Sequence, residues 1–412
     1  MRKILHVDLN SFYASVECLL DESIREFPVA VSGSQENRHG VILAKNNLAK
    51  KLGIKTGMTV YQAKKLAPNL VVRETHFDQY VKYSKAFKEL LTEYTDFVES
   101  FGIDEAWMDI TTCRKYGGDA VKIAEEIKNR VKNELGLTVS VGVSFNKIFA
   151  KLGSDLKKPD AVTVISVENY KEKIFKLPVE NLIYVGKATK TKLNKLMIKT
   201  IGDLAVADEK LLIKHLGKWG SILKAYANGK DNGEVKKFSE KDEYKSIGNS
   251  LTFYRDLDTD LDVETLLILL SESVCSRMID YGYKCARTVS LLIIDNLLNY
   301  TVRMAKFSVP TNLSSEVSAK VMELFKKNFN WTQKVRGLGV SLSDFTDEEQ
   351  LTFDFDLKDR NKKEKLEQTV ENLRKRFGRT SINRAVVLRE EKFMELDIKE
   401  GHSHGTLGKH KG

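Results

Sequence analysis

The chain has 412 residues, of which 42% are hydrophobic and 30% charged, so it is long enough for two to four domains with buried cores. Lys plus Arg exceed Asp plus Glu by 67 to 57, and the net charge of +10 indicates a polyanionic partner, either a nucleic acid or a membrane. Four cysteines without a CxxC pair exclude a disulfide-built scaffold, and the absence of a long apolar run or a signal peptide predicts a cytoplasmic protein.

The first 165 residues alternate between strand-like and helix-like patterns. A buried strand is predicted over residues 3–7, ending at Asp8, and a helix over residues 11–25. Further predicted elements are strands at 29–31 and 41–43, helices at 46–53 and 60–67, an amphipathic segment at 78–94, strand character at 97–110, a helix at 120–135 and a strand at 137–145. This alternation indicates an α/β domain.

The character of the chain changes after Pro178. Residues 184–230 carry ten lysines against three acids, so most of the net charge gathers there, and the polar residues 229–242 predict an exposed linker. The following residues predict an α+β module, with helices at 265–280 and 314–328 and strands at 287–294, 300–307 and 335–342. The last seventy residues are polar, with one helix-like piece at 365–377 and a tail in which His402, His404 and His410 indicate a disordered end rather than a metal site.

Three carboxylates lie in hydrophobic surroundings. Asp8 ends the first strand, and Asp104 and Glu105 lie between apolar residues. Buried carboxylates are unfavourable unless they are paired or bind a metal, and a few convergent carboxylates suit Mg²⁺ and phosphoryl or nucleotidyl transfer. Adjacent residues of a regular strand point to opposite faces, so Asp104 and Glu105 share a site only at a strand end, bulge or turn. On spacing alone, surface or capping acids are the commoner explanation.

Several motifs carry a resemblance to a known family. Residues 7–17 (Val-Asp-Leu-Asn-Ser-Phe-Tyr-Ala-Ser-Val-Glu) and 100–106 (Ser-Phe-Gly-Ile-Asp-Glu-Ala) resemble signatures of the Y-family translesion DNA polymerases. Matching residues follow in the same order at 40–55, 140–147 and 150–159, and the resemblance spans roughly residues 1–345. It is closest to the bacterial DNA polymerase IV (DinB) branch.

The resemblance implies a multidomain α/β and α+β fold, a right-hand polymerase with an added little finger. The expected domains are the palm at 1–10 and 75–165, the fingers at 11–74, the thumb at 166–230, a linker at 231–244, the little finger at 245–345 and a C-terminal tail at 346–412. In this family the first-strand Asp and the Asp-Glu pair bind two Mg²⁺, which implies that role for Asp8, Asp104, Glu105 and the backbone carbonyl of Leu9.

The resemblance also implies a nucleotide pocket. Register with the family motif places at Tyr13 the aromatic ring that excludes a 2′-OH, with Phe12 beside it, although two aromatic core residues on a helix are the alternative. Lys158 is expected to contact the triphosphate as a point charge; a solvated loop lysine is the alternative.

The predicted fingers depart from the family pattern. Asn47 and Lys50 stand where DinB-type enzymes usually carry a Tyr and an Arg that contact the triphosphate. Lys50 supplies charge without bidentate geometry, and Lys45 or Arg38 are candidates to compensate. The departure indicates a divergent subgroup with features of the UmuC-type polymerases.

The lysine-rich segment resembles a helix-hairpin-helix that holds phosphates without reading bases, with Gly186, Lys187, Lys190 and Lys192 as the expected contacts. Tyr184 replaces the first glycine that is common in such hairpins. On the predicted little-finger strands the candidate phosphate contacts are Lys284, Arg287, Arg303 and Lys306.

A short peptide follows the predicted little finger. Gln350, Leu351 and Phe353 are similar to the Gln-Leu peptides with which bacterial polymerases bind the sliding clamp. An amphipathic strand that returns to the body of the protein is an equally good interpretation of this peptide.

The sequence thus predicts a monomeric, template-directed DNA polymerase that tolerates damaged templates. Its expected cofactor is Mg²⁺, two per active site, and its expected partners are primer-template DNA, dNTPs and a sliding clamp, with no membrane. A catalytically dead DNA-binding scaffold and a two-metal nuclease are the alternatives.

Overall fold

A computed structural model describes residues 1–33, 40–240, 243–347 and 357–394. The chain divides between Lys241 and Asp242 into two units, each with its own core. Among the described residues no helix is both long and apolar enough to cross a membrane.

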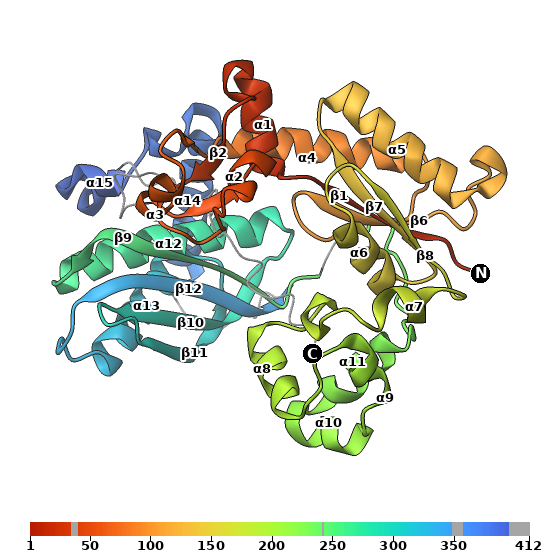
Figure 1. The fold of residues 1–412 in the computed structure, drawn as a ribbon. Coiled ribbons are helices and arrows are strands. Elements are labelled where there is room, and N and C mark those ends of the chain that lie inside the picture. Colours follow the sequence, from red (N-terminus) through yellow and green to blue (C-terminus); the bar gives the residue numbers. More distant parts are fainter. Residues whose placement is uncertain (34–39, 241–242, 348–356, 395–412) are drawn as a thin grey trace. The chain divides into compact units, whose positions relative to one another are not determined.

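The first strand, β1 (Ile4–Leu9), is central to the first unit because all six of its residues are buried. It pairs antiparallel with strands on both sides, and β8 extends the sheet by pairing parallel with β7, in the order β5-β6-β1-β7-β8 (Figure 1). The other four strands are β5 (Val98–Ser100), β6 (Glu105–Asp109), β7 (Val139–Ser144) and β8 (Val162–Ile165).

Successive side chains of β1 point to opposite faces of the sheet. Leu5, Val7 and Leu9 lie in the apolar core that includes residues of three helices, α1 (Phe12–Leu20), α4 (Phe77–Thr92) and α5 (Ala120–Leu135). His6 and Asp8 therefore point to the opposite face. There, α6 (Lys147–Leu156) contacts both β1 and β7.

A glycine allows α6 to lie close to this sheet. Gly142, on β7 opposite His6, would place a Cβ 1.9 Å from the carbonyl oxygen of Ala150 and 2.5 Å from the amide nitrogen of Ser154. Any side chain at Gly142 would therefore push α6 away from β1, the strand that carries His6 and Asp8.

A second, three-stranded sheet has the order β3-β2-β4. Its strands are β2 (Val29–Ser32), β3 (Ile42–Lys45) and β4 (Val71–Glu74). Two short helices with their own small core accompany it, α2 (Asn47–Lys51) and α3 (Val60–Leu66), and a capping box of Thr59 and Gln62 fixes the start of α3.

Residues 170–227 form a group of helices around a separate core (Figure 1). These are α7 (Tyr170–Ile174), α8 (Lys187–Lys195), α9 (Ile201–Val206), α10 (Glu209–Leu216) and α11 (Lys218–Ala227). Ile148 and Phe149 of α6 belong to the same core, so α6 joins this group to the five-stranded sheet.

The linker expected at 229–242 is exposed over most of the part that the structure describes, 229–240, but it is attached to the first unit. Val235 is only 4% exposed and packs with Ile4 and Trp107, and the amide of Lys236 donates to Glu99. Arg2 also donates to the carbonyl of Gly233 at 2.8 Å. Polar groups of this segment therefore form hydrogen bonds with the rest of the first unit as well as with water.

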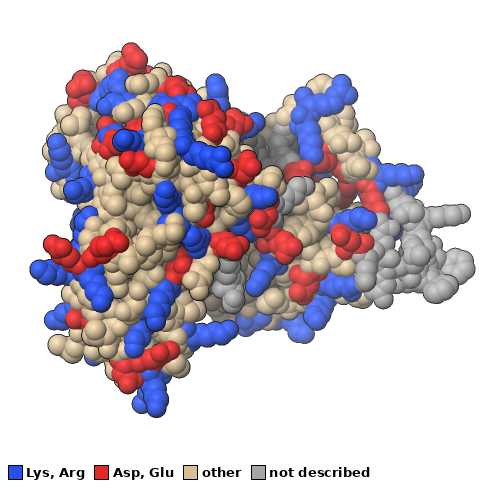
Figure 2. Space-filling model, turned by 90° about the vertical axis from the view of Figure 1, so that its right-hand side faces the viewer, with Lys and Arg blue, Asp and Glu red and all other residues tan. Residues whose placement is uncertain are grey.

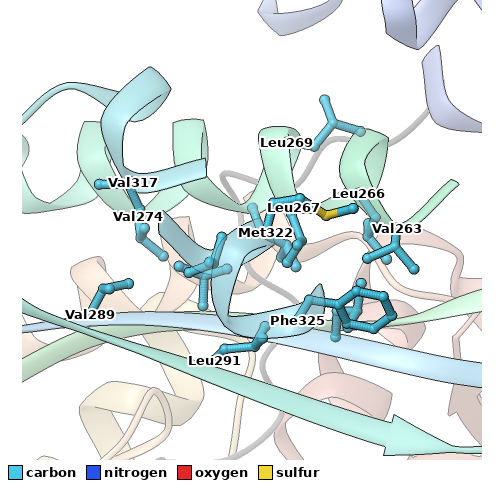
Figure 3. Packing of buried hydrophobic residues seen from close by; sticks show 14 of the residues in the cluster. Val263, Leu266, Leu267, Leu269, Val274, Val289, Leu291, Val317, Met322 and Phe325 are labelled. Carbon is cyan, nitrogen blue, oxygen red and sulfur yellow. The ribbon is translucent and has the colours of Figure 1, made fainter. Parts of the chain in front are cut away.

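The second unit is a four-stranded antiparallel sheet in the order β11-β10-β12-β9, with two helices over one face (Figure 3). Its strands are β9 (Ser246–Leu257), β10 (Cys285–Asp295), β11 (Tyr300–Thr311) and β12 (Val335–Thr346). Side chains of α12 (Asp260–Asp280) and α13 (Ser314–Asn328) fill the space above it, among them Leu266, Val317 and Phe325.

The C-terminal part contains more structure than the predicted tail. The helix expected at 365–377 begins earlier, as α14 (Leu357–Phe377), and α15 (Glu391–Met394) follows. Phe393 stacks on Phe253 with ring centroids 4.4 Å apart, and Val387 is buried in the core of the second unit. Short 3₁₀ turns elsewhere are Glu22–Ile24, Lys115–Gly118, Val179–Asn181, Arg379–Ser381 and Ala385–Arg389.

Candidate active site

Asp8 and Glu105 are brought together by strand register. They face each other directly across the antiparallel pair of β1 and β6. Cross-strand neighbours in such a pair have Cβ atoms about 5 Å apart. Together with His6, these residues offer ligand atoms that all lie within 4.8 Å of one another.

Asp104 lies at the end of a strand, where the sequence required it to be for a shared site. The strand expected over 97–110 is two strands, β5 and β6, with a turn between them. Lys88 holds this turn by donating to the carbonyl of Gly102 at 2.8 Å, and the amide of Leu9 donates to the carbonyl of Asp104 at 2.9 Å. The Asp104 side chain is not part of the 4.8 Å cluster, so the structure gathers two of the three predicted carboxylates tightly and places the third beside them.

Two lysines reach the carboxylates from α6 and the loop after it. The ammonium of Lys151 lies 3.0 Å from Asp8 and contacts Glu105, and that of Lys158 lies 2.8 Å from Asp8. Asp155 pairs with both lysines, at 3.4 Å and 2.8 Å. Asn10 fixes the loop, because its side chain accepts a hydrogen bond from the amide of Asp160 at 2.9 Å.

His6 closes the inner side of the cluster. It is fully buried, and its Nδ1 lies 2.8 Å from the hydroxyl of Ser154 while its Nε2 lies 3.4 Å from Glu105. Burial, with the charge of Lys151, holds the pKa of His6 well below its usual value, so the ring is neutral at physiological pH. The neutral imidazole therefore adds no positive charge to the cluster.

The carboxyl groups of this site differ in the direction in which their pKa values are shifted. Burial by itself would raise the pKa of Asp8, but the charges of Lys151 and Lys158 outweigh it and lower that pKa to about 2. Burial raises the pKa of Glu105 to about 8 despite the opposing charge of Lys151. Burial, and then the charge of Asp8, also raise the pKa of Asp104. Ionising all three carboxylates together is therefore unfavourable without a further cation.

The donor set fits a hard divalent cation. Asp8, Asp104, Glu105 and Asp155 carry four carboxylates when ionised, against two ammonium groups on Lys151 and Lys158. Carboxylate oxygens are the ligands that Mg²⁺ prefers, and the excess negative charge is what such an ion neutralises.

Tyr13 and Phe12 differ in exposure. Phe12 is 3% exposed and lies in the core, whereas Tyr13 is partly exposed and contacts that core from its surface. Burial, and then the charge of Asp104, raise the pKa of the Tyr13 hydroxyl. Tyr13 is thus partly exposed, whereas Phe12 packs in the core beside it, with the ring centroids 5.6 Å apart.

The residues predicted to contact the triphosphate from the fingers lie on α2. Asn47 and Lys50 are both exposed and three residues apart, so they share a face of this helix. Lys45 instead donates to the hydroxyl of Thr56 at 3.1 Å, and Arg38 lies outside the described residues.

The predicted phosphate contacts of the hairpin lie from the N-cap of α8 to its last turn. Gly186 is the N-cap, Lys187 and Lys192 are exposed, and Lys190 pairs with Glu180 at 2.5 Å. Tyr184, at the position of the missing glycine, takes the left-handed conformation with φ 71°, and its ring contacts Trp219 at 5.5 Å. Tyr184 thus takes a conformation that usually favours glycine, and its ring packs against a neighbouring aromatic ring.

In the second unit the candidate basic residues do not share one face. Lys306 of β11 pairs with Thr288, whereas Arg303 pairs with Leu291, whose side chain is in the core below the helices. Arg303 also donates to Asn328 of α13 at 2.9 Å.

Basic and acidic side chains are interspersed on the face of the molecule that Figure 2 shows, so no single-sign surface covers that face. Gln350, Leu351, Phe353 and the three histidines of the tail lie outside the described residues.

Sequence reasoning missed several residues of this site. The helix α6, which carries Lys151, Ser154 and Asp155, was not expected, although Asn146 caps it by accepting from the amide of Phe149 at 2.8 Å. That cap, followed by apolar residues at helical spacing, was the available signal. Nothing in the sequence indicated that Lys151 would meet Asp8 across 143 residues.

Comparison with known proteins decides between the functions that these residues allow. Residues 7–155 match the impB/mucB/samB family and residues 244–355 match its C-terminal domain. The chain is 49% identical to DNA polymerase IV of Acetivibrio thermocellus over 393 residues, covering 94% of this chain and 98% of that relative. It is 36% identical to DNA polymerase IV 1 of Bacillus subtilis, covering 95% of this chain and 94% of the relative.

The chain belongs to the DNA polymerase IV branch of the Y-family DNA polymerases.

A solved structure agrees with this assignment at the level of the fold. A Y-family DNA polymerase chimera superposes with a TM-score of 0.72 at 24% identity, covering 83% of this chain and 99% of that one. The expected multidomain polymerase fold is confirmed. The DNA polymerase IV relatives also confirm a DNA-directed DNA polymerase of translesion type that acts on DNA and nucleotides, so the scaffold and nuclease alternatives are set aside. Membership of the family implies use of a divalent metal.

Proposed function

We propose that the chain extends primers on damaged templates by two-Mg²⁺ nucleotidyl transfer, with Asp8, Asp104, Glu105 and the backbone carbonyl of Leu9 as ligands. The observation that carries this proposal is the register of β1 and β6, which sets Asp8 directly opposite Glu105. Such a pair of ions, when bound, promotes ionisation of the primer 3′-OH and neutralises charge on the triphosphate.

The lysines would exchange partners when substrate binds. Lys158 now lies 2.8 Å from both Asp8 and Asp155, on the side of the site that the loop after α6 covers. Cations at Asp8 would weaken its attraction to Lys158, which could then approach a phosphate oxygen as a point charge. Lys151 would remain with Asp155, its ion-pair partner four residues along the same helix.

The separate cores support most of the domain assignment; α1, which the assignment places in the fingers, packs in the core of the five-stranded sheet. We assign the palm to 1–10 and 75–165, the fingers to 11–74, the thumb to 166–230 and the little finger to 245–345. The five-stranded sheet, the three-stranded sheet, the α7–α11 group and the four-stranded sheet support these four assignments. Asn47 and Lys50 would then approach the triphosphate from the fingers, and Phe12 would support Tyr13 from below.

Binding of Mg²⁺ to the free enzyme should release a proton below about pH 8, because the pKa of Glu105 is about 8 and only its ionised form is a ligand. Affinity should therefore rise with pH by up to about tenfold per unit until Glu105 is ionised, and level off above that. Calorimetric titration with Mg²⁺ in buffers of different ionisation enthalpy measures the proton count. Glu105→Gln, which has no such proton, is the control, and a proton count of zero for the unaltered enzyme near pH 7 would contradict the prediction.

The exposed lysines of α8 should contribute to the salt dependence of DNA binding. Lys187→Ala and Lys192→Ala should each reduce the slope of log K against log salt by about 0.9, because each removes one phosphate contact. Lys190→Ala should have a smaller effect, since Glu180 already pairs with that lysine. Equal slopes for all three variants and the unaltered enzyme would argue against α8 as a DNA contact.

We further propose that Gln350, Leu351 and Phe353 bind a sliding clamp. Changing both Gln350 and Leu351 to Ala should abolish stimulation of primer extension by the clamp, because it removes the polar anchor and one apolar anchor of the peptide. Extension without clamp should be unchanged and serves as the control. Full stimulation of the double variant would refute this assignment. The monomeric state and the cytoplasmic location stay predictions from the sequence.

A further inference from the structure

The partly exposed ring of Tyr13 stacks on the ring of a second tyrosine. Tyr80 of α4 lies almost parallel to it, with the ring centroids 4.2 Å apart and the ring planes 11° apart. Tyr80 is fully buried, and the ring of Phe12 lies 6.2 Å from it. The plane of the buried ring therefore determines the plane of the ring that faces the site.

A buried carboxylate anchors this second tyrosine. Glu17 is 2% exposed, and it accepts a hydrogen bond from the Tyr80 hydroxyl. Both carboxylate oxygens of Glu17 also lie 3.0 Å from Nδ1 of His76, the residue before α4. Burial, and then this bond to Glu17, raise the pKa of Tyr80, so its hydroxyl remains a donor.

The position of Glu17 on α1 links its contact with Tyr80 to Tyr13. Glu17 and Tyr13 are four residues apart on α1, so they lie on one face of that helix, and Tyr80 contacts both of them from α4. Burying a carboxylate away from water is unfavourable, and apolar side chains in place of Glu17 and Tyr80 would fill the same space without that penalty. Glu17 has two hydrogen-bond partners, Tyr80 and His76, and its bond to Tyr80 is the one that reaches the ring stacked on Tyr13.

We propose that Tyr80 and Glu17 are positioning residues for sugar selection, which hold the ring of Tyr13 at the distance where it excludes a 2′-OH. The inference rests on the proposed role of Tyr13. A steric filter acts over a fraction of an ångström, since a group held about 0.5 Å from its productive place loses much of its effect. A ring that stacks on a fixed ring keeps its place, and one without that support can rotate away from the sugar.

The test is single-nucleotide insertion with dNTP and with the matching rNTP, measuring kcat/KM for each. Tyr80→Leu removes the stacked ring and should lower the dNTP-to-rNTP ratio by about tenfold, chiefly by raising kcat/KM for the rNTP. Tyr80→Phe and Glu17→Gln keep the rings but weaken the anchor, and should lower the ratio by about threefold. Tyr80→Phe leaves Glu17 paired with His76, so this variant should fold.

The controls separate positioning from general damage. Tyr94→Phe alters another buried tyrosine of the same core, whose hydroxyl accepts from Arg130 at 3.4 Å, and should leave the ratio unchanged. In the Tyr13→Ala background, Tyr80→Leu should produce no further loss of selection, because the two residues act through one ring.

Two results would overturn the inference, and they differ in meaning. If Tyr13→Ala relaxes selection but the Tyr80 and Glu17 variants lower both kcat/KM values equally, the positioning role is wrong and the role of Tyr13 stands. If Tyr13→Ala itself leaves the ratio unchanged, the proposed filter fails and the inference fails with it.

Discussion

Replacing Asp8 with Asn is expected to reduce primer extension by about 10³-fold or more, because it removes a proposed metal ligand at the point where charge develops in the transition state. The change keeps the size of the side chain and leaves its place in β1, opposite Glu105, intact. It also removes one of the two carboxylates that pair with Lys158. Steady-state extension of a primed template with Mg²⁺ and dNTPs measures the effect.

DNA affinity distinguishes this loss of chemistry from a loss of binding. Asp8→Asn removes a negative charge near the primer terminus, so binding of primed DNA should be as tight as before or tighter. Asp109→Asn is the matched control: it lies on the same strand as Glu105 but accepts from the amide of Thr111 at 2.9 Å, away from the cluster. Substantial extension by Asp8→Asn, or equal loss in both variants, would remove Asp8 from the catalytic set.

Replacing Tyr13 with Ala is expected to raise the incorporation of ribonucleotides relative to deoxyribonucleotides by about 10²-fold or more. The proposed steric barrier is the ring rather than the hydroxyl, and this ring stacks on the buried Tyr80 at a centroid distance of 4.2 Å. The measurement is the ratio of kcat/KM values for a dNTP and its rNTP in single insertion.

Tyr13→Phe is the control for this prediction, because it keeps the ring and its stacking partner Tyr80 while removing the hydroxyl that feels the charge of Asp104. Its selection should remain close to that of the unaltered enzyme. An unchanged ratio in Tyr13→Ala would mean that another group excludes the 2′-OH.

Local sequence patterns predicted most of the strand structure around Asp8, Asp104 and Glu105. A short apolar run ending in a charge predicted β1, and the alternation of side chains along a strand explained in advance why Asp104 and Glu105 could share a site only at a strand end. The structure has that strand end, since β6 begins at Glu105. The predicted continuous strand missed the turn, which Lys88 and the amide of Leu9 hold from elsewhere in the chain.

The lysines around these carboxylates could not be found in the same way. Lys151 and Asp8 are 143 residues apart, and only the packing of α6 against β1 brings them together. The stacking of Tyr13 on Tyr80 depends on the contact between α1 and α4 in the same manner. A pattern within one element carries no information on which other element will lie against it.

Two polar segments are attached to the fold more closely than their composition suggests. Residues 231–240 contain only two apolar side chains, Val235 and Phe238, yet Val235 is buried against the first sheet and the amide of Lys236 donates to Glu99. The helix α14 is similarly polar, with a mean composition typical of an exposed tail, but Arg374 pairs with Glu272 of α12 at 3.0 Å. Hydrogen bonds and ion pairs can attach a polar segment to a fold that its hydropathy would leave in solvent.

The missing side chain at Gly142 bears on how tolerant this enzyme is to mutation. Because a single methyl group there would meet the backbone of α6 at 1.9 Å, the spacing between the lysine-bearing helix and the carboxylate-bearing strands depends on a residue with no functional group. Inactivating substitutions should therefore occur at a position that takes no part in chemistry, and a search for essential residues confined to charged or polar side chains would overlook it.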